Sequence, residues 1–223
     1  MVKNVISGIF GLPGSGKTLY LSYLADRAVK GKNLNFSNQF YSMFKHYDDV
    51  YTTFPFSGAC KLDFEMLGKA KFENCLILID EIMMFCDSRN FKSFGENLKF
   101  FFSQHRHFGI DIVYASQAYD DVDKKIRNVT DSYYYISRWY GNFSRVQPIR
   151  ACFKVANGSI MSGYQYGTIW EDYYFNRKKF YALSDTNFSV GLPDFCDYVP
   201  VQWSEPEKPF PQPEGGGMAK TKK

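Results

Sequence analysis

The stretch from Gly11 to Thr18 reads Gly-Leu-Pro-Gly-Ser-Gly-Lys-Thr and matches the phosphate-binding loop pattern G-x-x-x-x-G-K-[ST]. It follows an apolar run, residues 5–10, and precedes residues 19–25, whose apolar positions have helical spacing. A strand, a glycine-rich loop and a helix in this order are the context that the pattern requires. The sequence therefore predicts a triphosphate-binding loop, and it limits the fold to those that can present one.

Each residue of this loop has an expected role in binding ATP. Its glycines let the backbone wrap an anion, so that the N–H groups of residues 14–18 point at the α- and β-phosphates. The Lys17 ammonium is expected to contact the β- and γ-phosphates, and the Thr18 hydroxyl to bind Mg²⁺. The predicted nucleotide-binding residues are Gly11, Pro13, Gly14, Ser15, Gly16, Lys17 and Thr18.

A pair of acids follows a second apolar run. Residues 75–79 are continuously apolar, which is typical of a parallel strand buried on both faces, and they end in Asp80 and Glu81. Taken alone, the pair would read as acids at a helix N-terminus. Downstream of a phosphate loop, we expect Asp80 to hold the metal's water shell, which makes Thr18 and Asp80 the predicted Mg²⁺ residues. We expect Glu81 to polarise a water in line with the γ-phosphate.

Another buried strand is predicted at residues 110–115, and it ends in Ser116 and Gln117. A polar side chain at the carboxyl end of a strand beside the acidic one can sense the γ-phosphate or position the attacking water. Gln117 therefore joins Glu81 as a predicted catalytic residue.

An arginine from a neighbouring subunit is also expected, because the γ-phosphate gains charge stabilisation from such a residue in the transition state. Arg106 precedes the strand that ends at Gln117, and Arg127 lies in the short helix predicted after it, at residues 121–129. Each could emerge at a subunit boundary, and each could equally be a solvated surface charge. Both stay candidates, and hydrolysis is expected to require oligomerisation.

The remaining patterns predict a fold of class α/β. It is a P-loop NTPase with a central, mostly parallel sheet flanked by helices, extended by C-terminal antiparallel strands. Further helices are predicted at residues 62–67 and 90–107, and a short strand at 33–36. Residues 37–61 read as a surface excursion. The antiparallel strands are expected at residues 132–139, 146–155 and 164–170.

Composition bounds the rest of the chain. We expect one ATPase domain over residues 1–203 and a disordered tail over residues 204–223, which are rich in Pro, Gly and Lys. The five cysteines lack a C-x-x-C pair and are interpreted as reduced thiols. No apolar stretch reaches the length of a membrane span. The formal net charge is +4, and Lys220, Lys222 and Lys223 at the end of the tail contribute three positive charges, so any nucleic-acid contact would depend on a local patch.

Several segments together resemble the zonula occludens toxin family, the ATPase domain of filamentous-phage assembly proteins. The matching segments are residues 11–18, 76–81, 103–109, 112–117 and 180–186. The resemblance implies an FtsK/HerA-like ring-forming motor, in which another strand separates the phosphate-loop strand from the acidic one. Family members continue into a transmembrane helix. This sequence continues into the tail instead, which leaves open whether a membrane-anchored partner supplies the anchor.

The resemblance implies a Mg²⁺-dependent ATP-hydrolysing motor for phage assembly and extrusion, in the host cytoplasm at the inner membrane face. Its implied partners are further copies of itself, in a ring such as a hexamer, and phage assembly or coat proteins. The alternative is a DNA-translocating or genome-packaging ATPase with the same chemistry and DNA as partner. A non-hydrolysing nucleotide switch is disfavoured, because a switch does not need the water-activating Glu81.

Overall fold

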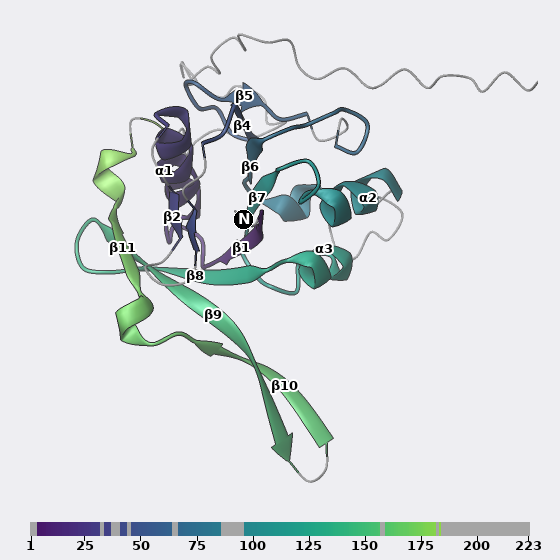
Figure 1. The fold of residues 1–223 in the computed structure, drawn as a ribbon. Helices are drawn as coiled ribbons and strands as arrows, with labels where there is room; N and C mark the ends of the chain where they lie inside the picture. The colour runs from purple at the N-terminus through teal and green to yellow at the C-terminus, as the bar shows by residue number, and fades with distance from the viewer. Residues whose placement is uncertain are drawn as a thin grey trace, which may run out of the picture.

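The computed structural model describes residues 4–31, 34–36, 41–43, 46–63, 67–85, 96–156, 159–181 and 183. They form a large β-sheet with helix α1 (Lys17–Val29) on one face and helices α2 (Glu96–Gln104) and α3 (Lys124–Val129) on the other (Figure 1). One buried apolar cluster lies between α1 and the sheet, and a second lies between the sheet and α2 and α3. The predicted α/β class is confirmed.

The centre of the sheet is parallel, with the strand order β8-β1-β7-β6-β4-β5. These strands are β1 (Ile6–Phe10), β4 (Asp49–Thr52), β5 (Cys60–Lys61), β6 (Cys75–Ile79), β7 (Asp111–Ser116) and β8 (Ser132–Arg138). β1, β6 and β7 are buried along their whole length, as their apolar runs predict. Because β7 lies between β1 and β6, the residues that follow all three strands meet at one edge of the sheet.

Helical spacing of large apolar residues places the helices on the sheet. α1 buries Tyr20, Leu21 and Leu24, which are at most 1% exposed and belong to the cluster on its side. α2 contributes Phe101 and Phe102 to the opposite cluster. The prediction of simple core packing for this aromatic stripe is confirmed over the part of the helix that the structure describes.

An antiparallel extension continues the sheet beyond β8. β8 pairs with β9 (Phe143–Ala156), which pairs in turn with β10 (Ser159–Tyr166) and β11 (Tyr173–Asn176). The β9–β10 hairpin projects from the body (Figure 1). The prediction for residues 132–139 was half right, because β8 is antiparallel to β9 but parallel to β1. β8 thus joins the parallel core to its extension.

The interpretation of residues 37–61 as a surface excursion was wrong for β4, and residues 37–40, 44 and 45 lie outside the described part. β4 lies inside the sheet, paired with β6, and its residues Val50, Tyr51 and Thr52 are buried. Val50 packs in the apolar cluster on the α1 side of the sheet and Tyr51 in the cluster on the other side, and the local sequence does not reveal either contact. β2 (Leu34–Phe36), which confirms the predicted short strand, pairs with β3 (Tyr41–Met43) in a separate two-stranded sheet.

Other element predictions differ at their ends. α2 confirms the helix predicted at 90–107 over residues 96–104, and residues 90–95 lie outside the described part. α3 begins at Lys124 because the Asp123 side chain caps it, accepting a hydrogen bond from the backbone N–H of Lys125 at 2.7 Å. In the segment predicted as a helix at 62–67, residues 62, 63 and 67 are not helical and residues 64–66 are not described. Residues 204–223 also lie outside, so the domain boundary stays a prediction.

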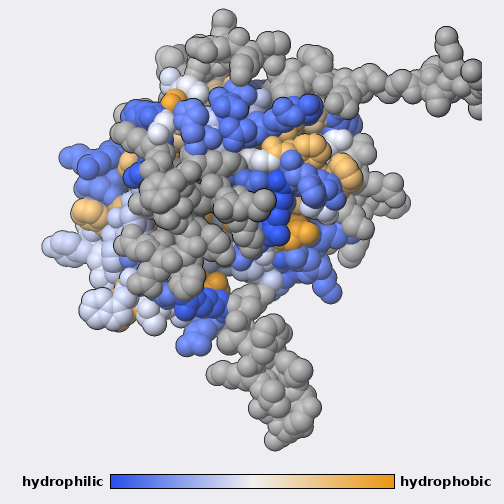
Figure 2. Space-filling model, viewed as in Figure 1, coloured by the Kyte–Doolittle hydropathy of each residue, from blue (hydrophilic) through white to orange (hydrophobic). Residues whose placement is uncertain are grey.

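The face drawn in Figure 2 is mostly hydrophilic, with hydrophobic side chains in separate small patches. The apolar residues of the described chain are concentrated in the two clusters beside the sheet. Among the helices that the structure describes, none combines the length and the hydropathy that a bilayer crossing requires. Cys60 and Cys75, within the described residues, are free thiols.

Candidate active site

The phosphate loop occupies the turn between β1 and α1, the strand–loop–helix context that the sequence predicts. Two of its glycines are required by geometry. A Cβ on Gly11 would lie 2.4 Å from the carbonyl oxygen of Ile136 in β8, closer than real atoms approach. Gly16 has φ 102°, a left-handed conformation that side chains other than glycine rarely adopt. The loop can therefore lie close against β8 and turn sharply into the helix.

Lys17 is folded over its own loop. Its Nζ donates hydrogen bonds to the carbonyl oxygens of Gly11 at 2.9 Å and Leu12 at 3.4 Å, and the residue is only 6% exposed. The ammonium thus lies inside the loop, where a bound triphosphate would place its charge. In the same loop, the hydroxyl of Ser15 is one of four buried side-chain polar atoms for which the described residues supply no hydrogen-bond partner. A polar ligand would satisfy it.

Thr18 and Asp80 come together from the two sides of the predicted metal site. The Thr18 hydroxyl donates a 2.7 Å hydrogen bond to Oδ2 of Asp80, which links the first turn of α1 to the end of β6. Burial raises the pKa of the Asp80 carboxyl, and the hydrogen bond from Thr18 acts against this shift. A hydroxyl and a carboxylate are hard oxygen ligands of the kind that Mg²⁺ prefers. These two residues therefore fit the role of holding Mg²⁺.

The backbone around the acid pair is held tightly. The N–H of Asp80 donates to the hydroxyl of Thr53 at 2.8 Å, and the N–H of Thr53 donates to the carbonyl of Leu78. Glu81 then adopts φ 49° and ψ 57°, a left-handed conformation that is unusual for glutamate. Strained backbone of this kind is maintained by surrounding structure and often occurs at functional sites. Thr53, which follows β4, was not singled out from the sequence.

Gln117 follows β7 and reaches toward the acid pair. Its Nε2 lies 3.5 Å from Oε1 of Glu81, a long hydrogen bond between the ends of adjacent strands. The two predicted catalytic side chains are therefore neighbours at the edge of the sheet where the phosphate loop lies. Their arrangement leaves both carboxylate and amide able to contact a water.

Arg106 is not at this edge. Its guanidinium forms an ion pair with Asp131, which also accepts a hydrogen bond from the N–H of Ile6, and the carbonyl of Arg106 accepts one from Asn4. Asn4 and Asp131 lie just before β1 and β8, so Arg106 sits at the amino edge of the sheet, opposite its own phosphate loop. Within one subunit it does not reach the site, and its action in a neighbour's site stays a prediction.

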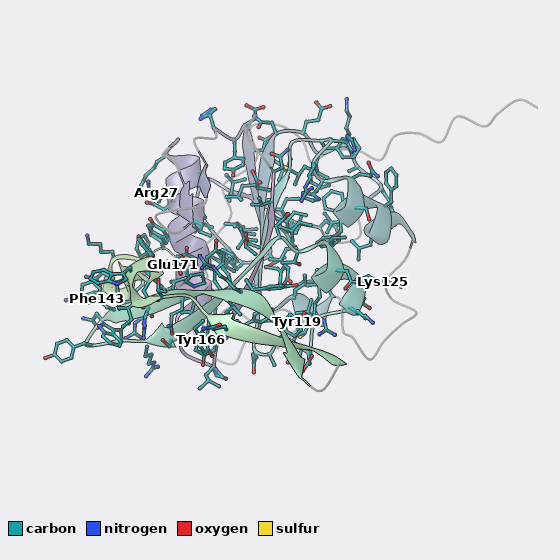
Figure 3. The ribbon with its side chains drawn as sticks, turned by 60° about the horizontal axis from the view of Figure 1, so that its bottom comes forward. Arg27, Tyr119, Lys125, Phe143, Tyr166 and Glu171 are labelled. Atoms are coloured by element: carbon teal, nitrogen blue, oxygen red, sulfur yellow. The ribbon has the colours of Figure 1, made fainter. Side chains whose placement is uncertain are left out.

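Arg127 lies on the side of the sheet that carries α3. Its Nη1 is 3.0 Å from Oδ1 of Asp120, and its guanidinium carbon is 4.5 Å from the centre of the Tyr119 ring. Figure 3 shows Tyr119 well separated from Phe143, which follows the turn between β8 and β9. The Tyr119 ring centre is 5.6 Å from that of Phe10, the last residue of β1 before the phosphate loop, so Arg127 lies one aromatic ring away from the end of β1. Its action in a neighbour's site stays a prediction.

Three side chains that the sequence did not single out hold the phosphate loop. Arg138, the last residue of β8, donates from Nε to the carbonyl of Gly14 at 2.8 Å. Ser144 in β9 donates to the carbonyl of Ser15 at 2.7 Å. Arg177, in the 3₁₀ turn η4 (Arg177–Lys179), packs against Gly16, where an added Cβ would lie 3.1 Å from its Cδ. The loop is thus supported by the antiparallel extension, and only the pairing of β8 with β1 and β9 could have revealed it.

Comparison with known proteins places these features in context. A family model described as zonular occludens toxin (Zot) matches residues 9–151, well over half of the 223 residues. A search of curated proteins found no match.

Similar solved structures include the N-terminal domain of zonular occludens toxin from Neisseria meningitidis. It is 18% identical, with a TM-score of 0.45, over 82% of this chain and 100% of that one. The genome packaging NTPase B204 from Sulfolobus turreted icosahedral virus 2, in complex with ATP-gammaS, is 14% identical with a TM-score of 0.42, over 64% and 78%. B204 described as the DNA-packaging ATPase from Sulfolobus Turreted Icosahedral Virus is 11% identical with a TM-score of 0.41, over 73% and 98%.

Proposed function

This chain belongs to the zonular occludens toxin family, and we propose that it is a Mg²⁺-dependent ATPase that drives filamentous-phage assembly and extrusion. The observation that carries the proposal is the hydrogen bond between Thr18 and Asp80. It brings a helix-capping loop that suits a triphosphate next to the acidic end of a buried strand. The residues that would bind the nucleotide therefore lie beside those that would hydrolyse it.

In this proposal the loop binds the nucleotide before any chemistry occurs. Its backbone N–H groups and the N-terminus of α1 attract the phosphates, and Lys17 exchanges its bonds to the Gly11 and Leu12 carbonyls for bonds to phosphate oxygens. Thr18 and Asp80 would hold Mg²⁺, which when bound neutralises charge on the β- and γ-phosphate oxygens. Asp80 offers a carboxylate whose burial cost is offset by a cation.

Hydrolysis requires a water aligned with the γ-phosphate and a group to accept its proton. Glu81 is positioned as the general base, because its carboxylate lies beside Asp80 and faces the amide of Gln117. Gln117 would orient the same water through its side-chain amide. The left-handed backbone at Glu81 aims this carboxylate along a direction that a relaxed chain would not give.

The proposal also includes a cellular location, an oligomeric state and partners. In our proposal the protein works in the host cytoplasm at the inner membrane face, as a ring-forming oligomer that acts with coat or assembly proteins and a membrane-anchored partner. Arg106 or Arg127 of one subunit would complete the site of the next. A motor that instead translocates DNA would have the same site, and it would differ in that DNA accelerates its turnover.

The experiment that tests the proposal measures ATP binding and phosphate release with Mg²⁺ for the wild type and for Lys17→Ala. We expect Lys17→Ala to abolish turnover, because it removes the buried ammonium inside the loop. Lys30→Ala is the matched control, since Lys30 is exposed at the other end of α1 and pairs with Asp26. Unchanged turnover in Lys17→Ala would overturn the site, and a rise on adding DNA would favour the translocase.

A further inference from the structure

An aromatic pocket lies on the surface beside the phosphate loop. Trp139 and Tyr140 from the turn between β8 and β9, Phe143 at the start of β9, and Tyr174 of β11 line it. These side chains are 38–89% exposed, although most aromatic residues in the described part of the chain are buried or half-buried. Large aromatic groups that stay exposed and adjacent commonly mark a binding site. The rings have no role in the chemistry proposed above.

The pocket is built rather than loose. The Trp139 and Tyr174 ring centres are 5.6 Å apart, and the guanidinium of Arg145 lies over the Trp139 ring at 5.4 Å. Arg145 is held in turn by Asp172, to which its Nε donates at 2.6 Å. The turn itself closes through the backbone N–H of Trp139, which donates to the carbonyl of Phe143 at 2.9 Å, and through the N–H of Phe143, which donates to the carbonyl of Tyr140 at 3.2 Å. A ligand would therefore meet the Trp139 and Tyr174 rings in positions that are already fixed.

The same turn is attached to the phosphate loop. Arg138 immediately precedes Trp139 and donates to the carbonyl of Gly14, within the loop. Arg177 donates from Nη2 to the carbonyl of Gly141 at 2.9 Å while its side chain packs against Gly16. One arginine thus connects each side of the turn to the loop. A nucleotide bound at the loop and a group held in the pocket would be parts of one ligand.

The order of the strands decides which part of that ligand reaches the pocket. The acid pair and Gln117 follow β6 and β7, on one side of β1, whereas the turn follows β8, on the other side. Figure 1 shows β8 and β6 on opposite sides of β1, and Figure 3 shows Phe143 at the far end of the extension from Tyr119. The γ-phosphate must face Glu81, so the opposite end of the nucleotide points toward the turn. That end carries the base.

We propose that the pocket of Trp139, Tyr140, Phe143 and Tyr174 stacks the purine base of ATP, which rests on the proposed nucleotide site. Stacking suits a base because every base has a π-face. An aromatic partner therefore lowers the dissociation constant of the nucleotide without base-specific hydrogen bonds. Trp139 is held by Arg145 and Tyr174, whereas Tyr140 is 89% exposed and able to close over the ligand. The base thus anchors one end of the ligand and the loop the other.

The test compares two ligands, ATP and inorganic tripolyphosphate, by calorimetric titration with Mg²⁺. We expect Tyr140→Ala and Trp139→Ala to raise the dissociation constant of ATP by about 5-fold to 100-fold each, the range for lost base stacking. Tripolyphosphate, which has no base, should bind the variants and the wild type equally. Trp170→Ala is the matched control, because Trp170 is 88% exposed but lies outside the pocket, in η3 (Ile169–Glu171).

Energy transfer from tryptophan to an N-methylanthraniloyl-labelled ATP gives a second readout. Trp139→Phe keeps an aromatic ring, so it should retain ATP affinity while transfer to the label falls by more than in Trp170→Phe, which should also retain ATP affinity. The Trp139→Phe variant also keeps the proposal testable if Trp139→Ala does not fold.

The outcomes separate the two proposals. A wild type that binds neither ATP nor tripolyphosphate would overturn the nucleotide site itself. Equal affinities for both ligands, with ATP binding unchanged in Tyr140→Ala, would overturn the base pocket and leave the phosphate site standing. Loss of self-association in Tyr140→Ala at unchanged ATP affinity would overturn the base pocket too, and it would assign the rings to a subunit contact.

Discussion

The hydroxyl of Thr18 donates a 2.7 Å hydrogen bond to Oδ2 of Asp80, joining residues that lie 62 positions apart in the sequence. Thr18 belongs to the first turn of α1, and Asp80 follows β6, two strands away from β1 in the sheet. The bond fixes the distance between the phosphate loop and the acidic strand. It also keeps two oxygen ligands side by side while one of them, Asp80, is buried at a cost.

Asp80→Asn separates two effects of the Asp80 carboxylate: the loss of stability from burying its charge, and its role in binding Mg²⁺. The raised pKa of Asp80 means that the folded protein holds this proton more tightly than the unfolded chain. The resulting stabilisation is greatest at low pH and is lost as the pH rises from about 3.8 through the folded pKa. Above that window the wild type carries a buried charge that Asn lacks. We expect Asp80→Asn, without nucleotide, to unfold at an equal or higher temperature than the wild type at pH 8.

Mg²⁺ and ATP should reverse this order. At a ligand concentration of about 100 times the dissociation constant, binding stabilises a folded protein by about 2.7 kcal/mol. We expect the wild type to gain this stabilisation and Asp80→Asn to lose its Mg²⁺-dependent part, as measured by thermal unfolding with and without Mg²⁺. Asp120→Asn is the control, because that carboxylate is 90% exposed. An Asp80→Asn variant with the Mg²⁺ response of the wild type would remove Asp80 from the metal site.

The strained backbone of Glu81 leads to a prediction about stability. A left-handed conformation costs a residue other than glycine about 1 kcal/mol or more, and glycine adopts it without this cost. We therefore expect Glu81→Gly to be more stable than Glu81→Ala by about 1 kcal/mol in urea unfolding, while both variants lose turnover. Equal stabilities would mean that the strain is relieved by local movement in the protein.

The two arginine candidates lead to a prediction about mixed oligomers. Arg106 forms a half-exposed ion pair with Asp131, so Arg106→Ala should cost at most about 1 kcal/mol of stability. If Arg106 acts in a neighbour's site, mixing Arg106→Ala subunits with Glu81→Gln subunits should restore part of the turnover. Some sites would then combine an intact Glu81 with an intact Arg106. No recovery at any mixing ratio, with rings still forming, would pass the role to Arg127.

The sequence predicted the parts of the site that depend on local patterns. The phosphate loop has its own motif, and the strand before Asp80 is a continuous apolar run, which is typical of a parallel strand buried on both faces. Since parallel strands end at one edge, the periodicity of the chain was enough to predict that these residues lie together. The adjacency of Glu81 and Gln117 follows from the order β7-β6.

What the sequence did not predict depends on pairing between distant strands. β4 has few apolar residues of its own, and it is buried because its pairing with β6 and β5 places it between the two apolar clusters of the sheet. Arg138 reaches the phosphate loop only because β8 runs parallel to β1, whereas the local pattern indicated an antiparallel strand. Arg177 is brought there by β11, a strand that was not predicted. Non-local register is not encoded in the periodicity of a single segment.

ATP hydrolysis with Glu81 as the general base is tested most directly by a single-turnover measurement of phosphate release from Mg²⁺·ATP by the wild type and by Glu81→Gln. Glutamine keeps the size of the side chain and removes its capacity to accept a proton, so ATP affinity should be unchanged. We expect the wild type to release phosphate and Glu81→Gln to release it more slowly by about 10²-fold or more, the scale of a lost general base. Equal rates in the two proteins, or a wild type that binds ATP without releasing phosphate, would contradict hydrolysis at this site.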